Sequence, residues 1–224
     1  KRDNKIILFN LLRDRIEISS INSRLNETKS GLKIGYIRLK QFNANASKEM
    51  RNSIINLDKS YARGFILDLR SNPGGLLEVS IDIARQWINK GIIVSTQTRD
   101  GIKDVRKANG KALTNKPLVI LINEGSASAS EILSGAIKDN KRGILIGKKT
   151  FGKGLVQSVR SLSDGSGLTV TIAKYLTPNG IDINRNGLKP DIEIDVKSNS
   201  KINLNYEDLA TSRDNQYKAA ETEL

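Results

Sequence analysis

Segments with the two-residue apolar spacing of strands alternate along this chain with segments that have the spacing of helices. Residues 65–69 read as a strand that enters a glycine-containing turn, and residues 76–87 then place apolar side chains at helical intervals. Leu118–Ile122 is an unbroken apolar run, which is typical of a strand buried on both faces. This alternation favours an α/β fold, in which helices cover a sheet.

The other predicted elements follow the same pattern. A helix is predicted from about Ser47, its N-cap, because Met50, Ile54 and Leu57 recur at helical spacing. A second helix, built of small residues, is predicted after the apolar run. Further strands are predicted at residues 6–12, 16–18, 34–39, 92–98, 102–106, 144–146, 155–159 and 168–173.

The composition removes several kinds of catalytic chemistry. The 224 residues include no Cys and no His, which excludes thiol nucleophiles, Ser-His-Asp triads and structural zinc. Acid–base chemistry must then use Lys, Asp, Glu or Tyr, and we expect no cofactor and no metal. Lys and Arg number 37 against 24 Asp and Glu, so the net charge is +13, which predicts attraction to anionic surfaces and not a fold.

A run of small residues follows the apolar run, in Gly125-Ser126-Ala127-Ser128-Ala129-Ser130-Glu131. A helix N-terminus offers unpaired N–H groups and the positive end of the helix dipole, which suit a developing oxyanion. A structural interpretation is also open, since Ser128 and Glu131 have the spacing of a capping box. The run by itself leaves three candidate serines.

A lysine lies between two glycines, in Phe151-Gly152-Lys153-Gly154. Glycines allow close approach of the backbone, and a lysine in desolvated surroundings can lose its proton and act as a general base. Gln157 follows four positions later, so in an extended chain its side chain points to the same face as Lys153. The alternative is a flexible surface loop with a solvated lysine.

The predicted strand 65–69 leads into a turn, in Asp68-Leu69-Arg70-Ser71-Asn72-Pro73-Gly74-Gly75. Asp68 and Arg70 share a face by the two-residue rule, and an opposite-charge pair there would hold a loop rigid. Gly74 and Gly75 can present bare backbone N–H groups to a substrate oxygen. The alternative is that Asn72-Pro73-Gly74-Gly75 only forms a turn, since these residue types are common in turns.

Taken together, these motifs resemble, in order and in spacing, those of the C-terminal processing peptidases, or tail-specific proteases. The resemblance covers most of the chain from about Ile18. That family uses a Ser-Lys dyad with the lysine about 25 positions beyond the serine, and 25 positions separate Ser128 from Lys153. The matching motifs are residues 35–39, 67–75, 125–131, 150–157, 177–180 and 187–191.

The resemblance implies a serine endopeptidase that processes or degrades proteins near their C-termini. Ser128 would be the nucleophile, Lys153 the general base and Gln157 the residue that orients the lysine. The oxyanion hole would consist of the backbone N–H groups of Gly74 and Ala129. Supporting positions, without chemistry of their own, are Asp68, Arg70 and Glu131.

The resemblance also implies a ClpP/crotonase-like core with a mixed sheet and flanking helices. Residues 1–18 would be the end of a truncated PDZ-like domain, 19–196 the peptidase core and 197–224 a polar, partly helical segment. The polar stretch 22–33 is interpreted as a junction.

PDZ domains of that family bind a substrate's C-terminal tail by strand addition, so protein substrates recognised at the tail are the expected partners. No transmembrane segment is predicted, and an exported compartment is implied, such as the periplasm, cell envelope or thylakoid lumen.

Basic residues crowd the segment between the two dyad positions. They predict a positive local field that attracts a substrate's terminal carboxylate, although long basic side chains also commonly lie in water away from a site. The residues concerned are Lys138, Lys141, Arg142, Lys148 and Lys149.

Two other classes of protein account for parts of the sequence. A catalytically inactive scaffold of the same fold explains all but the intact set Ser128, Lys153 and Gln157. A basic nucleic-acid-binding module explains the charge, but aromatic residues make up only 4% of the chain and no nucleic-acid motif is present. No nucleic-acid partner is therefore expected.

Overall fold

The computed structural model describes residues 19–195 and 206–224. The strands predicted at 6–12 and 16–18, and the PDZ-like segment 1–18, lie outside the described residues. In the part of the chain that is described, no helix has the length and apolar character that a bilayer span requires.

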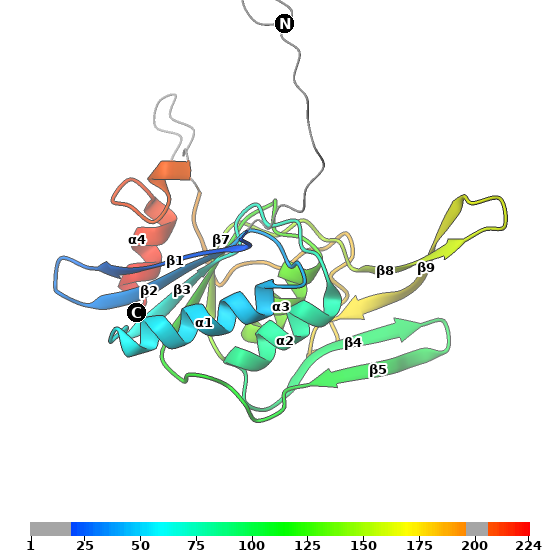
Figure 1. The fold of residues 1–224 in the computed structure, drawn as a ribbon, viewed down its shortest axis with the longest axis horizontal. Helices are drawn as coiled ribbons and strands as arrows, with labels where there is room; N and C mark the ends of the chain where they lie inside the picture. Colours follow the sequence, from blue (N-terminus) through cyan, green and yellow to red (C-terminus); the bar gives the residue numbers. More distant parts are fainter. Residues whose placement is uncertain (1–18, 196–205) are drawn as a thin grey trace, which may run out of the picture.

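A six-stranded mixed sheet forms the centre of the molecule (Figure 1). Only β1 runs antiparallel to its neighbour, and the other neighbours pair in parallel. All residues of β3 and β6 are buried, as their apolar runs predict. In sheet order the strands are β1 (Ile21–Glu27), β2 (Lys33–Leu39), β3 (Gly64–Asp68), β6 (Leu118–Ile122), β7 (Ile144–Gly147) and β10 (Ile192–Glu193).

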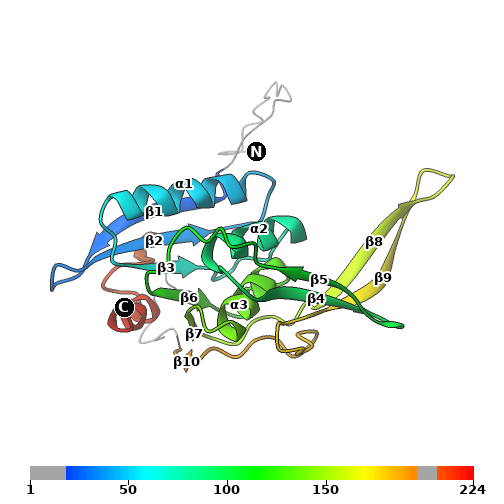
Figure 2. The ribbon, with the colours of Figure 1, turned by 90° about the horizontal axis from the view of Figure 1, so that it is seen from below.

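Helices cover both faces of this sheet, as Figures 1 and 2 show. On one face lie α1 (Ala46–Lys59), α2 (Leu77–Trp87) and α3 (Ala129–Asp139), which bury a large core against alternate strand residues. On the other face, α4 (Asn215–Thr222) packs Tyr217 and Ala220 into a smaller core with Tyr36. A short 3-10 helix, η1 (Tyr206–Asp208), precedes α4.

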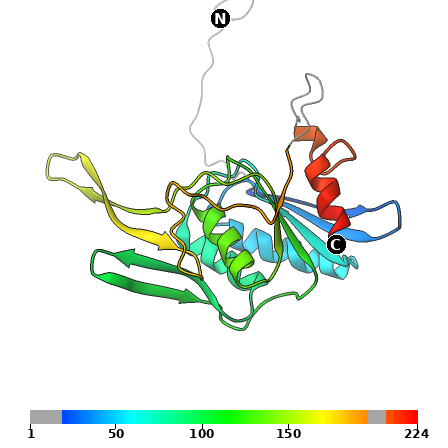
Figure 3. The same cartoon turned by 180° about the vertical axis from the view of Figure 1, so that it is seen from behind.

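A second, four-stranded antiparallel sheet in the order β5-β4-β9-β8 extends from the body as two hairpins (Figure 3). Apolar side chains are exposed along the outer hairpin, among them Val159 and Ile172. The strands are β4 (Ile92–Thr98), β5 (Gly101–Lys107), β8 (Leu155–Ser161) and β9 (Gly167–Leu176).

Two local predictions were wrong. Residues 22–33 are not a junction, because most of them form β1 and its turn into β2. β1 is an edge strand that exposes most of its side chains, so its sequence lacks the alternating apolar residues from which a strand is predicted. The helix predicted from about Ser47 begins at Ala46, but its N-cap is Asn45, two positions before the predicted Ser47, and makes no side-chain capping bond.

The topology brings three loops to one edge of the central sheet. β3, β6 and β7 are neighbours and run in parallel, so their carboxyl ends lie side by side. Ligand and active sites of such sheets form at this edge, in the loops that leave the strands.

Candidate active site

The predicted site residues lie on the three loops that leave this edge. Gly74 is on the loop after β3, Ser128 on the loop after β6 and Lys153 on the loop after β7. These residues are far apart in the sequence, but their loops lie close together because the three parallel strands that precede them end at the same edge of the sheet. The sheet thus brings together the three motifs that stand apart in the sequence.

Ser128 is distinguished from its two neighbouring serines by its backbone and its exposure. It is the N-cap of α3 with φ 56° and ψ −114°, a left-handed conformation that costs a non-glycine residue about 1–3 kcal/mol. Ser126 and Ser130 are fully buried, and their hydroxyls donate to the carbonyl oxygens of Leu69 and Asn72. Ser128 is half-buried. Ser128 therefore differs from both neighbouring serines, and its role as nucleophile stays a prediction.

Gly74 packs directly against the start of α3. Its φ is +100°, and a Cβ there would lie 2.7 Å from the Ala127 carbonyl oxygen and 2.9 Å from the Ala129 nitrogen. The two predicted oxyanion donors therefore belong to backbone segments in contact. In this structure the Gly74 N–H donates to Asn72 Oδ1 at 2.9 Å, so an acceptor of its own loop occupies it.

A single buried carboxylate joins the backbones of both proposed dyad residues. Glu131 is fully buried, and its Oε2 accepts from the N–H groups of Ser128 and Lys153, each at 2.9 Å. Its Oε1 accepts from the Thr150 hydroxyl at 2.6 Å and from Gly152 N–H at 2.7 Å. The bond to Ser128 is the one a capping box predicts, and the other three extend the role of Glu131 to the lysine loop.

The lysine loop is anchored and not a flexible surface loop. A Cβ on Gly154 would lie 2.6 Å from the Asn184 nitrogen, and one on Gly152 would lie 3.0 Å from the Gly187 nitrogen. Arg185 N–H also donates to the Gly152 carbonyl oxygen. The glycines on both sides of Lys153 thus permit close packing against residues 184–187, which links two of the sequence motifs.

The side chains of Lys153 and Gln157 are both exposed, so the desolvation expected for Lys153 is absent from this structure. No hydrogen bond within the described residues joins Lys153 to Ser128 or to Gln157. The alternation that would align Lys153 with Gln157 is interrupted, because a register shift lies between Val156 and Gln157. The structure therefore brings together the dyad backbones but not the dyad side chains.

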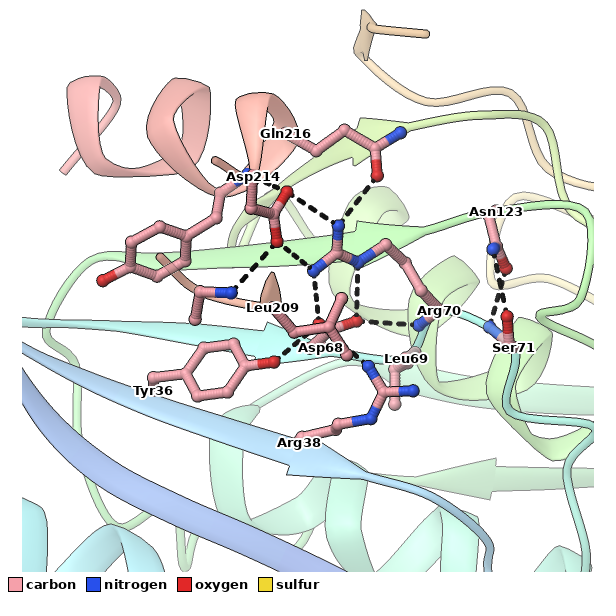
Figure 4. A network of polar contacts seen from close by, with 12 residues as sticks. Tyr36, Arg38, Asp68, Leu69, Arg70, Ser71, Asn123, Leu209, Asp214 and Gln216 are labelled. Atoms are coloured by element: carbon pink, nitrogen blue, oxygen red, sulfur yellow. Dashed lines mark hydrogen bonds and ion pairs between the residues drawn. The ribbon is translucent and has the colours of Figure 1, made fainter. Parts of the chain in front are cut away.

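The ion pair between Asp68 and Arg70 is confirmed. Both side chains are buried, and Arg70 donates to the two Asp68 oxygens from Nε at 3.0 Å and Nη2 at 2.6 Å. Tyr36 and Arg38 also donate to Asp68 (Figure 4). Burial alone would raise the pKa of Asp68, but the charge and hydrogen bonds of Arg70, helped by Arg38 and Tyr36, outweigh it and lower that pKa.

Arg70 has two further partners that the sequence analysis did not identify, Asp214 and Gln216 on the C-terminal segment. They lie 144 and 146 positions further along the chain. Nothing in the local pattern of either residue indicates this pairing.

The basic residues between the dyad positions do not form an unopposed positive patch. Lys138 pairs with Asp191, and Lys148 pairs with Glu193 and Asp195. The Arg142 guanidinium instead donates to backbone carbonyl oxygens, including that of Trp87. Two of the five basic residues, Lys138 and Lys148, are thus paired with carboxylates from the later part of the chain.

The comparison with protein families places this chain in a family of peptidases. The model of peptidase family S41 matches residues 33–194. The chain therefore belongs to peptidase family S41.

Relatives of known name support this assignment. The carboxyl-terminal-processing protease of Synechocystis sp. is 47% identical over 212 residues, which cover 95% of this chain and 48% of that protein. The chloroplastic carboxyl-terminal-processing peptidase 2 of Arabidopsis thaliana is 46% identical over 190 residues, 82% of this chain and 37% of that protein. The solved structure of the photosystem II D1 C-terminal processing protease matches with a TM-score of 0.76 and 40% identity over 82% of this chain and 50% of that chain. This chain spans about half the length of the curated relatives it matches, or less.

Proposed function

We propose that this chain carries the catalytic part of a serine endopeptidase that cleaves proteins near their C-termini through a Ser128–Lys153 dyad. The single observation that carries the proposal is the Glu131 carboxylate, which accepts from the backbones of both residues. The names of the S41 relatives supply the reaction class.

In this mechanism the Ser128 hydroxyl attacks the carbonyl carbon of the scissile peptide bond while the neutral Lys153 amine takes its proton. The N–H groups of Gly74 and Ala129 receive the oxyanion. Collapse of the tetrahedral intermediate breaks the C–N bond, and the Lys153 ammonium returns the proton to the leaving amine. A water molecule then attacks the acyl ester while Lys153 takes its proton. The bond between the acyl carbon and Ser128 Oγ breaks, the new carboxyl terminus leaves, and the Lys153 ammonium returns the proton to Ser128.

Two adjustments must accompany substrate binding. The Lys153 side chain must turn toward Ser128, where Gln157 would hold its amine, and the Gly74 N–H must exchange Asn72 Oδ1 for the substrate oxygen. A bound peptide would cover Lys153 and exclude water from it, which supplies the desolvation that favours a neutral amine. In this proposal the substrate completes the active side-chain geometry on a backbone that Glu131 has already positioned.

The dyad is tested by the labelling rate with a fluorophosphonate, which phosphonylates reactive serines in a single covalent step: an O–P bond forms, the P–F bond breaks and fluoride leaves. Wild-type protein should be labelled and Ser128→Ala should not. Lys153→Ala should be labelled about 10²–10⁴-fold more slowly, the range for loss of a general base. Lys149→Ala is the matched control, because Lys149 is an exposed lysine of the same loop, and it should label at the wild-type rate. An unlabelled wild-type protein would support the inactive scaffold instead.

We also propose that the substrates are proteins recognised at a C-terminal tail, with residues 1–18 as the end of a PDZ domain and 19–196 as a ClpP/crotonase-like core. The support is the sequence resemblance and the names of the relatives. Mass-spectrometric digestion of matched peptides with free and amidated C-termini tests tail dependence. Equal cleavage of the two peptides would contradict it.

We assign the protein to an exported compartment such as the periplasm, cell envelope or thylakoid lumen. The support is that matching relatives come from cyanobacteria and that others are named chloroplastic. Fractionation of source cells with an antibody against this chain tests the assignment, and recovery only in the cytosolic fraction would refute it.

A further inference from the structure

The Arg70 guanidinium uses its complete donor capacity. A guanidinium has five N–H donors, and Arg70 makes five side-chain hydrogen bonds. Asp68 receives two of them, Asp214 receives two at 3.0 and 2.7 Å, and Gln216 receives one at 3.0 Å (Figure 4). The side chain is only 5% exposed, so water cannot readily replace a missing acceptor.

The two acceptors from the C-terminal segment are themselves held in place. Asp214 is fully buried, caps α4 by accepting from Tyr217 N–H, and also accepts from Ala210 N–H. Gln216 is fully buried as well, and its amide nitrogen donates to the Ile194 carbonyl oxygen beyond β10. The segment therefore presents both acceptors to Arg70 in a set geometry.

Arg70 is also the residue from which the proposed oxyanion loop departs. Ser71, Gly74 and Gly75 all have positive φ, at 57°, 100° and 148°. Such conformations persist only where surrounding contacts determine them. Asn72 Nδ2 donates to the Leu39 carbonyl oxygen and supports the middle of this loop, while Arg70 fixes its beginning.

We propose that Asp214 and Gln216 are positioning residues of the active site: through Arg70 they hold loop 71–75 so that Gly74 faces the start of α3. The catalytic consequence rests on the proposed function, whereas the effect on the loop does not. If the contact only fastened α4 to the sheet, its loss would loosen α4 and leave loop 71–75 unchanged.

The test compares Asp214→Asn with Asp208→Asn. Asparagine caps helices as well as aspartate does, so Asp214→Asn keeps the α4 cap when its oxygen takes the Oδ1 position. Its NH2 group then faces one Arg70 donor and the Ala210 N–H. Asp208 is a buried aspartate of the same segment that pairs with Arg213 and not with Arg70, so its variant is the matched control.

The first measurement is amide hydrogen exchange by mass spectrometry, which needs no catalytic activity. In Asp214→Asn, loop 71–75 should exchange about tenfold faster than in wild type, while β6 is unchanged, because a local opening and not global unfolding is expected. Asp208→Asn should match wild type in this loop. Unchanged loop exchange in Asp214→Asn, or equal acceleration in both variants, would overturn the proposal.

The second measurement is peptide hydrolysis. Asp214→Asn should lower kcat at least about tenfold with little change in KM, since oxyanion stabilisation acts on the transition state. A wild-type protein without hydrolysis would refute the proposed function, and the exchange measurement would still decide the role of Asp214. If Asp214→Asn does not fold, Gln216→Met removes one acceptor at similar volume, and its loop exchange decides the matter in the same way.

Discussion

Replacement of Glu131 by Gln tests the central contact of the proposed site, because the two side chains differ by one acceptor. In the best orientation the amide oxygen takes the Oε2 position and keeps the bonds from Ser128 and Lys153 N–H. The NH2 group then faces the Thr150 hydroxyl, which can turn and accept, and the Gly152 N–H, which cannot.

The expected loss of stability follows from the Gly152 N–H, which is left without an acceptor. A buried N–H without a partner costs about 1–3 kcal/mol. The remaining bonds weaken without the negative charge, but removing an ionised group from the interior offsets that loss. We therefore expect Glu131→Gln to lower the free energy of unfolding by about 1–3 kcal/mol. Glu131→Ala should lose more, because it strands the N–H groups of Ser128, Gly152 and Lys153 together.

Urea denaturation followed by the fluorescence of Trp87, the single and fully buried tryptophan, measures this difference. Glu124→Gln is the matched control on the loop after β6, since Glu124 is exposed, and it should remain within about 0.5 kcal/mol of wild type. Fluorophosphonate labelling should survive better in Glu131→Gln than in Glu131→Ala. A Glu131→Gln protein as stable as the control would refute the fourfold acceptor role.

Three further predictions concern the loop after β3 and the proposed base. Gly74→Ala should destabilise by more than Gly101→Ala, because both positions have positive φ but only Gly74 has atoms within 4 Å of an added Cβ, and equal losses in urea denaturation would contradict the close approach. Asp68→Asn should be less stable than wild type, with the full difference in unfolding free energy above the ordinary Asp pKa of 3.8. The difference should shrink as the pH falls from there through the lowered folded pKa, because protonation of Asp68 removes the negative charge that the variant also lacks. A difference that stays constant down to about pH 2 would oppose this. Lys153→Ala should leave the unfolding free energy within about 0.5 kcal/mol of wild type, as its side chain is exposed, and a larger loss would show a structural role.

Much of the fold is readable from the sequence because buried parallel strands carry apolar runs, as β3 and β6 do. β1 escaped prediction because an edge strand with exposed side chains needs no such run. Ser128 and Lys153 are predicted from the sequence through the family resemblance, and the structure joins their backbones through Glu131. The orientation of Gln157 relative to Lys153 could not be predicted, because the register shift before Gln157 depends on how β8 pairs with β9. The pairing of Arg70 with Asp214 joins positions 144 residues apart, and only the packing of α4 on the sheet determines it.

The placement of these partners along the chain has a consequence for synthesis. Translation proceeds from the N-terminus, so Arg70 emerges long before Asp214, and the loop with Ser128 precedes the strand and loop that carry Lys153. Until β7 pairs with β6 and α4 docks, a nascent chain holds the proposed nucleophile without its base and Arg70 without its second carboxylate. A ribosome-bound peptidase of this design would be inert toward its own unfolded polypeptide and toward its neighbours. In the proposed mechanism, this order delays the pairing of Ser128 with Lys153 until β7 and the loop after it have been made.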